Sequence, residues 1–94
     1  MAVKAVTRVP SRGGVFLVAA LREVLENQIT ANDPPETALT LARLLRDGVA
    51  EDEAWRWLSA VMLQEMSLIV RYNRPFDRDG YVAALRRLPE LTDR

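Results

Sequence analysis

The stretch that decides the fold is Asn32-Asp33-Pro34-Pro35-Glu36. Asp33 is a residue type that caps helix N-termini, Pro34 suits the first helical position, and Glu36 would complete a reciprocal capping pattern. The two prolines also end whatever helix precedes them. The stretch therefore predicts a sharp corner between two helices, with Asp33 and Glu36 as caps of the second helix.

Outward from this corner, apolar residues recur at helical spacing in both directions, and strand-like alternation is absent. The predicted helices span residues 15–31, 34–47, 51–72 and 78–88. The third is the longest and carries apolar residues on more than one side, which is typical of a central helix. The sequence therefore predicts an all-α fold, a compact four-helix domain with a long central third helix.

Residues 1–14 show no sustained period and end in Ser11-Arg12-Gly13-Gly14, so they are predicted to form a flexible basic N-terminal arm. The four-helix domain then covers residues 15–89, and residues 90–94 form a polar tail. The 94-residue chain has no formal net charge, and its arm carries +3. Because the charges balance, the chain has no global attraction for nucleic acid or an anionic membrane. No segment approaches the roughly 20 apolar residues of a membrane span, and we expect a cytoplasmic protein without a membrane partner.

The composition also removes several kinds of chemistry. Cysteine and histidine are both absent, which excludes disulfides, thiol catalysis, Cys- or His-ligated zinc and imidazole acid–base catalysis. The acidic run Glu51-Asp52-Glu53 suits the positive end of a helix dipole better than a cation site. No nucleophile–base pair or phosphate loop is present. We therefore expect no enzymatic activity, no catalytic residues, no metal and no cofactor.

Glu65 is the most informative single residue, because it falls in the middle of the apolar stripe of the third helix. A lone buried carboxylate is costly and needs a partner. Gln28 lies equally inward on the first helix, and Tyr81 lies inward on the fourth. We predict that Glu65 accepts hydrogen bonds from Gln28, from the Tyr81 hydroxyl, or from the free N–H groups at the start of the second helix. Such a polar clasp would fix helix register; a ligand-binding role is the alternative.

Two further features concern the last helix and the surface of the third. Asp77 follows the turn Asn73-Arg74-Pro75-Phe76 and is predicted to cap the fourth helix. Several large apolar residues of the third helix fall outside its main stripe. Aromatic and methionine side chains favour interfaces. The candidate interface consists of Trp57, Leu63, Met66 and Val70.

The functional expectation follows from these features. The chain is predicted to be a non-catalytic helical protein-interaction module, with self-association or another protein as its partner and a homodimer as one form. The alternative is a nucleic-acid-associated regulator that uses the basic arm, residues 4–12. A helix-turn-helix interpretation is disfavoured, because its recognition helix would open with Glu51-Asp52-Glu53 and meet phosphates with the wrong sign.

The motifs at the turns and helix ends of the chain, taken in order, resemble those of a small all-helical domain of uncharacterised bacterial proteins. The sequence pattern of that domain is, in chain order, NDPPE, a helix, a helix start of the form G-x-S/T-x-E-E-A, an inward Glu, PFD-x-x-x-Y and a final L-P. The matching residues, within 21–89, are Asn32-Asp33-Pro34-Pro35-Glu36, Leu44-Leu45, Gly48, Glu53-Ala54, Glu65, Pro75-Phe76-Asp77, Tyr81, Leu85, Leu88 and Pro89. The resemblance implies an all-helical fold and no known activity. Ala50 replaces an expected Ser or Thr cap and Gly80 an expected helix former, each costing on the order of 0.5–1 kcal/mol.

Overall fold

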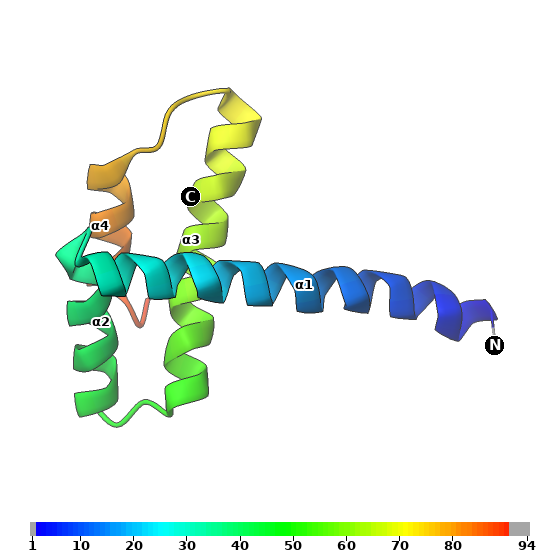
Figure 1. Ribbon diagram of the computed structural model, residues 1–94, viewed down its shortest axis with the longest axis horizontal. Helices are drawn as coiled ribbons and strands as arrows, with labels where there is room; N and C mark the ends of the chain where they lie inside the picture. The colour runs from blue at the N-terminus through cyan, green and yellow to red at the C-terminus, as the bar shows by residue number, and fades with distance from the viewer. Residues whose placement is uncertain (1, 91–94) are drawn as a thin grey trace.

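The computed structural model describes the backbone of residues 2–90 and the side chains of residues 17–90. Its helices are α1 (Ala2–Ala31), α2 (Pro35–Arg46), α3 (Glu51–Tyr72) and α4 (Arg78–Arg87). No strand occurs within residues 2–90, so the predicted all-α four-helix fold is confirmed. The axes of α2, α3 and α4 are roughly parallel in Figure 1, with α3 running opposite to α2 and α4, and α1 lies across them. Each helix packs against at least two others.

Helix α1 begins at Ala2 and not near Val15, so residues 2–14 extend the helix where the sequence predicted a non-helical arm. Pro10 and the glycines at 13 and 14 are poor helix formers, which is why the sequence pattern indicated a break. Adding a residue to a helix that already exists requires no new nucleus, however, and that favours continuation. Figure 1 shows this N-terminal half of α1 projecting away from the other three helices.

The core is built from apolar side chains of all four helices. Among residues 17–90, α3 supplies five of the twelve buried apolar residues, which confirms its central position. The buried set is Leu21, Leu25, Leu44, Ala54, Trp55, Leu58, Val61, Met62, Tyr81, Ala84, Leu85 and Leu88.

The face of α2 that points into the core is not the one that its apolar residues predict. Ala42 and Leu45 share an apolar helix face with Ala38 and Leu41, yet the structure exposes both and buries Thr37 and Thr40 with Leu44. The rotation brings the Thr37 hydroxyl within 2.7 Å of the Gln28 side-chain oxygen, so the buried hydroxyl is satisfied. A polar contact with α1 therefore helps to set which face of α2 points inward.

The helix ends are made by residues in the left-handed region. Gly48 follows α2 with φ of +94°, as its predicted position after the helix requires. Asn32 (φ 54°) and Asn73 (φ 49°) reverse the chain after α1 and α3. Asparagine tolerates this conformation better than other side chains do. None of the helices in residues 2–90 combines the length and apolar character that crossing a bilayer requires.

Candidate functional site

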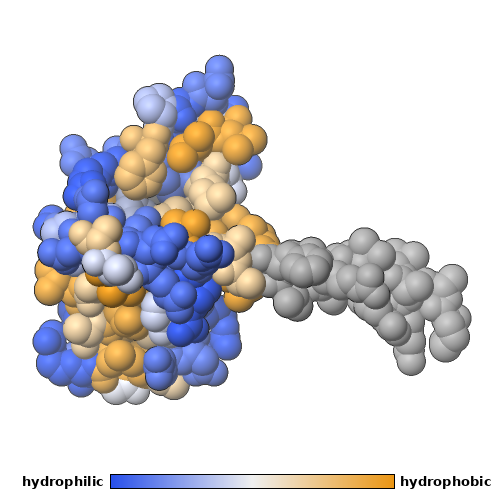
Figure 2. Space-filling view, in the orientation of Figure 1, coloured by the Kyte–Doolittle hydropathy of each residue, from blue (hydrophilic) through white to orange (hydrophobic). Residues whose placement is uncertain are grey.

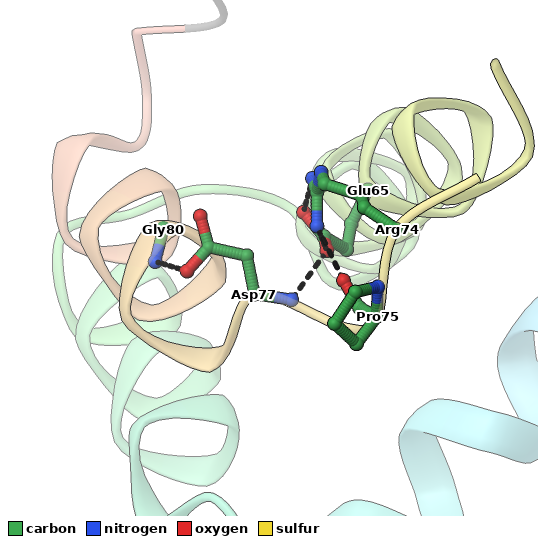
Figure 3. A network of polar contacts seen from close by, with 5 residues as sticks. All are labelled: Glu65, Arg74, Pro75, Asp77 and Gly80. Atoms are coloured by element: carbon green, nitrogen blue, oxygen red, sulfur yellow. Dashed lines mark hydrogen bonds and ion pairs between the residues drawn. The ribbon is translucent and has the colours of Figure 1, made fainter. Parts of the chain in front are cut away.

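Glu65 is buried, as predicted, but its partners come from the connection between α3 and α4. The Arg74 guanidinium donates to both carboxylate oxygens, at 3.0 and 3.1 Å, and the Asp77 backbone N–H donates at 2.8 Å (Figure 3). The same Arg74 also donates to the Pro75 carbonyl at 2.7 Å. Both oxygens of the buried carboxylate are therefore satisfied, which compensates for its desolvation.

The left-handed residue Asn73 explains how Arg74 reaches Glu65. It turns the chain back along α3, and the Arg74 N–H donates to the Ile69 carbonyl at 3.2 Å. The predicted partners Gln28 and Tyr81, and the N–H groups at the start of α2, do not contact Glu65. That part of the prediction is wrong, because helical periodicity carries no information about a side chain beyond the helix end.

Gln28 and Tyr81 instead form a second polar cluster with Thr37. The Gln28 side-chain oxygen accepts hydrogen bonds from the Tyr81 hydroxyl at 2.9 Å and from the Thr37 hydroxyl at 2.7 Å. This cluster joins α1, α2 and α4. Burial raises the pKa of Tyr81 above 10.0, and its hydrogen bonds with Thr37 and Gln28 oppose the rise. The single clasp predicted from the sequence is thus two separate clusters.

A third polar contact, which the sequence did not predict, holds the end of α4. Arg43 of α2 donates to the Leu88 carbonyl at 2.8 Å and to the Leu85 carbonyl at 3.1 Å. The last carbonyls of a helix have no intrahelical partner, and a cation also suits that end of the dipole. Arg43 also lies in the last turn of α2, where a cation suits the dipole of its own helix; spacing within α2 could not reveal its contact with α4.

The corner between α1 and α2 is confirmed, but its predicted caps are not. Helix α2 starts at Pro35 with Pro34 in the N-cap position, and no side chain caps it. Because the helix starts one residue later than predicted, Asp33 lies outside it and forms an exposed ion pair with Arg78 at 2.8 Å. Glu36 lies in the first turn, where its charge suits the dipole, and pairs with Arg86 at 3.3 Å.

The cap of α4 is confirmed. The Asp77 side chain accepts from the Gly80 N–H at 3.0 Å, as Figure 3 shows. A Cβ atom at position 80 would collide with the Asp77 carboxylate. Gly80 therefore makes room for the cap, which explains a residue that looked unfavourable in a helix. The N-cap residue of α3 is Ala50, and no side chain caps this helix, as expected.

Three of the four predicted interface residues lie together on the outer face of α3. Leu63 and Met66 are each 39% exposed and Val70 is 82% exposed. With Ser67 and Arg71 they line an open groove of about 410 Å³. Figure 2 shows apolar side chains gathered over the C-terminal half of α3. We call Leu63, Met66 and Val70 the α3 stripe.

Trp57 does not belong to the α3 stripe. It is partly buried and packs against the hydrophobic core. The prediction that it shares a surface with Leu63 is therefore wrong. Near the N-terminal end of α3, the core covers a wider part of the helix surface than the helical pattern indicated.

A second concavity, of about 390 Å³, lies between α1 and the first turns of α3. It is lined by Val18, Arg22, Asp52, Trp55, Arg56 and Ser59. The Arg22 guanidinium stacks on the Trp55 ring, 3.8 Å from its centroid, and also pairs with Glu26 at 3.1 Å. The Trp55 ring nitrogen is buried without a hydrogen-bond partner among the described residues.

Within the side chains that the structure describes, no group of three or more acidic residues is arranged to hold a metal ion. Comparison with protein-family models, curated proteins and solved structures finds no match. The resemblance to a bacterial helical domain therefore stays a prediction, and the geometry of the chain itself has to support any function.

Proposed function

We propose that this protein is a non-catalytic helical protein-interaction module that self-associates as a homodimer. The observation that carries the proposal is apolar surface that the described residues leave exposed. The α3 stripe lies on a helix whose opposite face is core, and Val70 within it is 82% exposed. Figure 2 shows a second apolar area where α1 leaves the bundle. Contiguous exposed apolar surface marks interaction sites in soluble proteins.

The buried polar groups support a structural role better than a catalytic one. Glu65 is 3% exposed and both its oxygens accept hydrogen bonds from the protein. A general acid or base must reach a substrate proton, and this carboxylate has no open approach. The Gln28 cluster likewise uses its amide oxygen to join helices. Both clusters hold the scaffold that presents the apolar surfaces.

Sedimentation equilibrium of the purified full chain, over a wide range of protein concentration, tests this proposal. We expect a reversible monomer–dimer equilibrium. A monomer at every concentration up to the millimolar range would overturn the homodimer. Repeating the measurement in high salt is informative, because an apolar interface persists there whereas one held by exposed charges weakens.

One observation favours a second candidate function, the nucleic-acid-associated regulator. The backbone of residues 2–14 is helical, and positions 4, 8 and 12 are Lys, Arg and Arg. Residues spaced by four share a helix face, so three basic positions form one row. Such a row could contact phosphates of a nucleic acid.

Fluorescence anisotropy with duplex DNA separates the two candidates. A regulator would bind at moderate salt and lose binding when Lys4, Arg8 and Arg12 are replaced by Gln. The same replacement of Arg86 and Arg87 is the control for nonspecific attraction. If the unsubstituted protein and the Arg86/Arg87 control variant both lose DNA binding between low and moderate salt, the regulator is rejected.

A further inference from the structure

The outer face of α3 continues from the α3 stripe to the second concavity. Residues at positions 52, 56, 59, 63, 66 and 70 are separated alternately by four and three residues, so they follow one side of the helix. All six are exposed or half-buried. The C-terminal half of this row is the α3 stripe, and the N-terminal half lines the concavity together with Trp55 of α3 and with Val18 and Arg22 of α1. One half of the face thus offers exposed apolar side chains, and the other half offers space that could receive them.

The charges along one edge of this face are opposite at its two ends. Glu53 in the first turn and Arg71 in the last turn are 18 residues apart, about five helical turns, so they point to the same side of α3. Glu53 pairs with Arg56 at 2.6 Å through one carboxylate oxygen, and its side chain is still 40% exposed. Arg71 is exposed and forms no ion pair with any residue that the structure describes. The basic end of the edge therefore lacks a counter-charge that the acidic end of another copy can supply.

We infer that two copies pair through this face with their α3 helices antiparallel, so that Met66 and Val70 of each copy enter the concavity beside Trp55 of the other. This inference rests on the self-association proposed above. A twofold axis near position 62 sets each half of the face against the opposite half of the other copy, and every contact then occurs twice. Val18, which is 59% exposed at the rim of the concavity, is covered by the same contact.

Size and charge select a second copy as the occupant. In this register Leu63 lies opposite the exposed Ala60 of the other copy, and a large side chain opposite a small one lets two helices approach closely. Arg71 lies opposite Glu53 of the other copy, at both ends of the contact. A parallel pair would set Arg71 beside Arg71 and Glu53 beside Glu53, and like charges across an interface are unfavourable. The face therefore complements its own reverse, which is the property of a twofold interface.

Charge reversal tests the inference. Arg71→Glu would face Glu53 of the other copy, and Glu53→Arg would face Arg71, so each substitution should weaken the dimer at least tenfold in sedimentation equilibrium. The double variant restores opposite charges and should regain most of this affinity. Glu51→Arg changes an exposed residue of the same first turn outside the row, and this matched control should leave the dissociation constant unchanged. A double variant that dimerises no better than either single variant would overturn the antiparallel register.

Cross-linking through single cysteines tests the orientation independently, because the chain has no cysteine. In the antiparallel pair the two copies of position 63 are offset by two residues, about 3 Å along the helix, and those of position 70 by sixteen residues, about 24 Å. With a short bis-maleimide linker, Leu63→Cys should yield a covalent dimer and Val70→Cys should not. Leu39→Cys, at an exposed position of α2, controls for random collision and should remain monomeric on the gel.

The outcomes separate this inference from the proposed function. A sedimenting dimer that is insensitive to both charge reversals, or that cross-links through Val70→Cys or Leu39→Cys, would overturn the antiparallel α3 pair and leave the homodimer intact. A monomer at every concentration of the unsubstituted chain would overturn both.

Discussion

At the residue scale, the buried ion pair between Glu65 and Arg74 decides how α3 connects to α4. The carboxylate side chain is 4% exposed, and it holds both Arg74 and the N–H that precedes α4. The hydrogen bond with Glu65 raises the pKa of Arg74, so the pair stays charged. Removing one partner leaves the other buried and unpaired, which costs more than the pair contributes when intact.

This gives a direct stability prediction. Glu65→Gln should lower the free energy of unfolding by about 1.5–3 kcal/mol, because it removes charge-assisted hydrogen bonds and turns an amide toward donors. Arg74→Met should destabilise the protein more than Glu65→Gln does, since it leaves the buried Glu65 carboxylate without its charged partner. Urea unfolding of dilute protein measures both. Arg78→Met, which breaks the exposed pair with Asp33, is the matched control and should cost less than about 1 kcal/mol. Unchanged stability of Glu65→Gln would contradict the clasp.

Tyr81 gives a prediction for alkaline pH. Its pKa is raised by burial above 10.0, so the folded state prefers the protonated phenol. The stability that this group contributes is therefore complete below pH 10 and is lost as the pH rises through the folded-state pKa. Tyr81→Phe should cost about 0.5–1.5 kcal/mol at neutral pH and reduce the alkaline loss. Chemical unfolding at pH 7 and above pH 10 measures both effects. Tyr72→Phe, at an exposed tyrosine, should leave the alkaline loss unchanged.

At the element scale, the structure shows which features a single sequence reveals. The four helices, the cap at Asp77 and the burial of Glu65 follow from periodicity and cap chemistry, which are local. The partner of Glu65 does not, because a left-handed Asn73 brings Arg74 back over the helix. The face of α2 that points inward also differs from its apolar pattern, since the buried Thr37 hydroxyl donates to the Gln28 side-chain oxygen.

The start of α1 was missed for a different reason. Local propensity disfavours a helix across Pro10 and the glycines at 13 and 14. The helix continues because it extends an existing one, and extension requires no new nucleus. Propensities rate residues one at a time and do not include this gain.

The uncapped start of α3 gives a prediction at this scale. Ala50 has the extended conformation of an N-cap residue but no side chain that can accept a hydrogen bond. Ala50→Ser should raise the free energy of unfolding by about 0.5–2 kcal/mol by satisfying a free N–H group. Thermal unfolding measures it. Ala60→Ser, on an exposed position inside the same helix, should give no stabilisation. Equal effects of the two substitutions would contradict a capping gain.

At the scale of the whole molecule, the described residues form a bundle that presents the α3 stripe as exposed apolar surface. The stripe lines an open groove, which leaves room for side chains of a partner. We therefore propose this surface for self-association, and a different protein is the other partner that it could bind.

The dimer dissociation constant of two matched variants tests the proposed homodimer most directly. Val70→Glu places a charge on the α3 stripe, whereas Leu39→Glu places the same charge on α2; both residues are exposed, so neither change should unfold the bundle. Sedimentation equilibrium should show dimerisation weakened at least tenfold by Val70→Glu, about 1.4 kcal/mol, and unchanged by Leu39→Glu. Equal effects of the two substitutions, or a monomer at every concentration of the unsubstituted chain, would contradict a homodimer that forms through the α3 stripe.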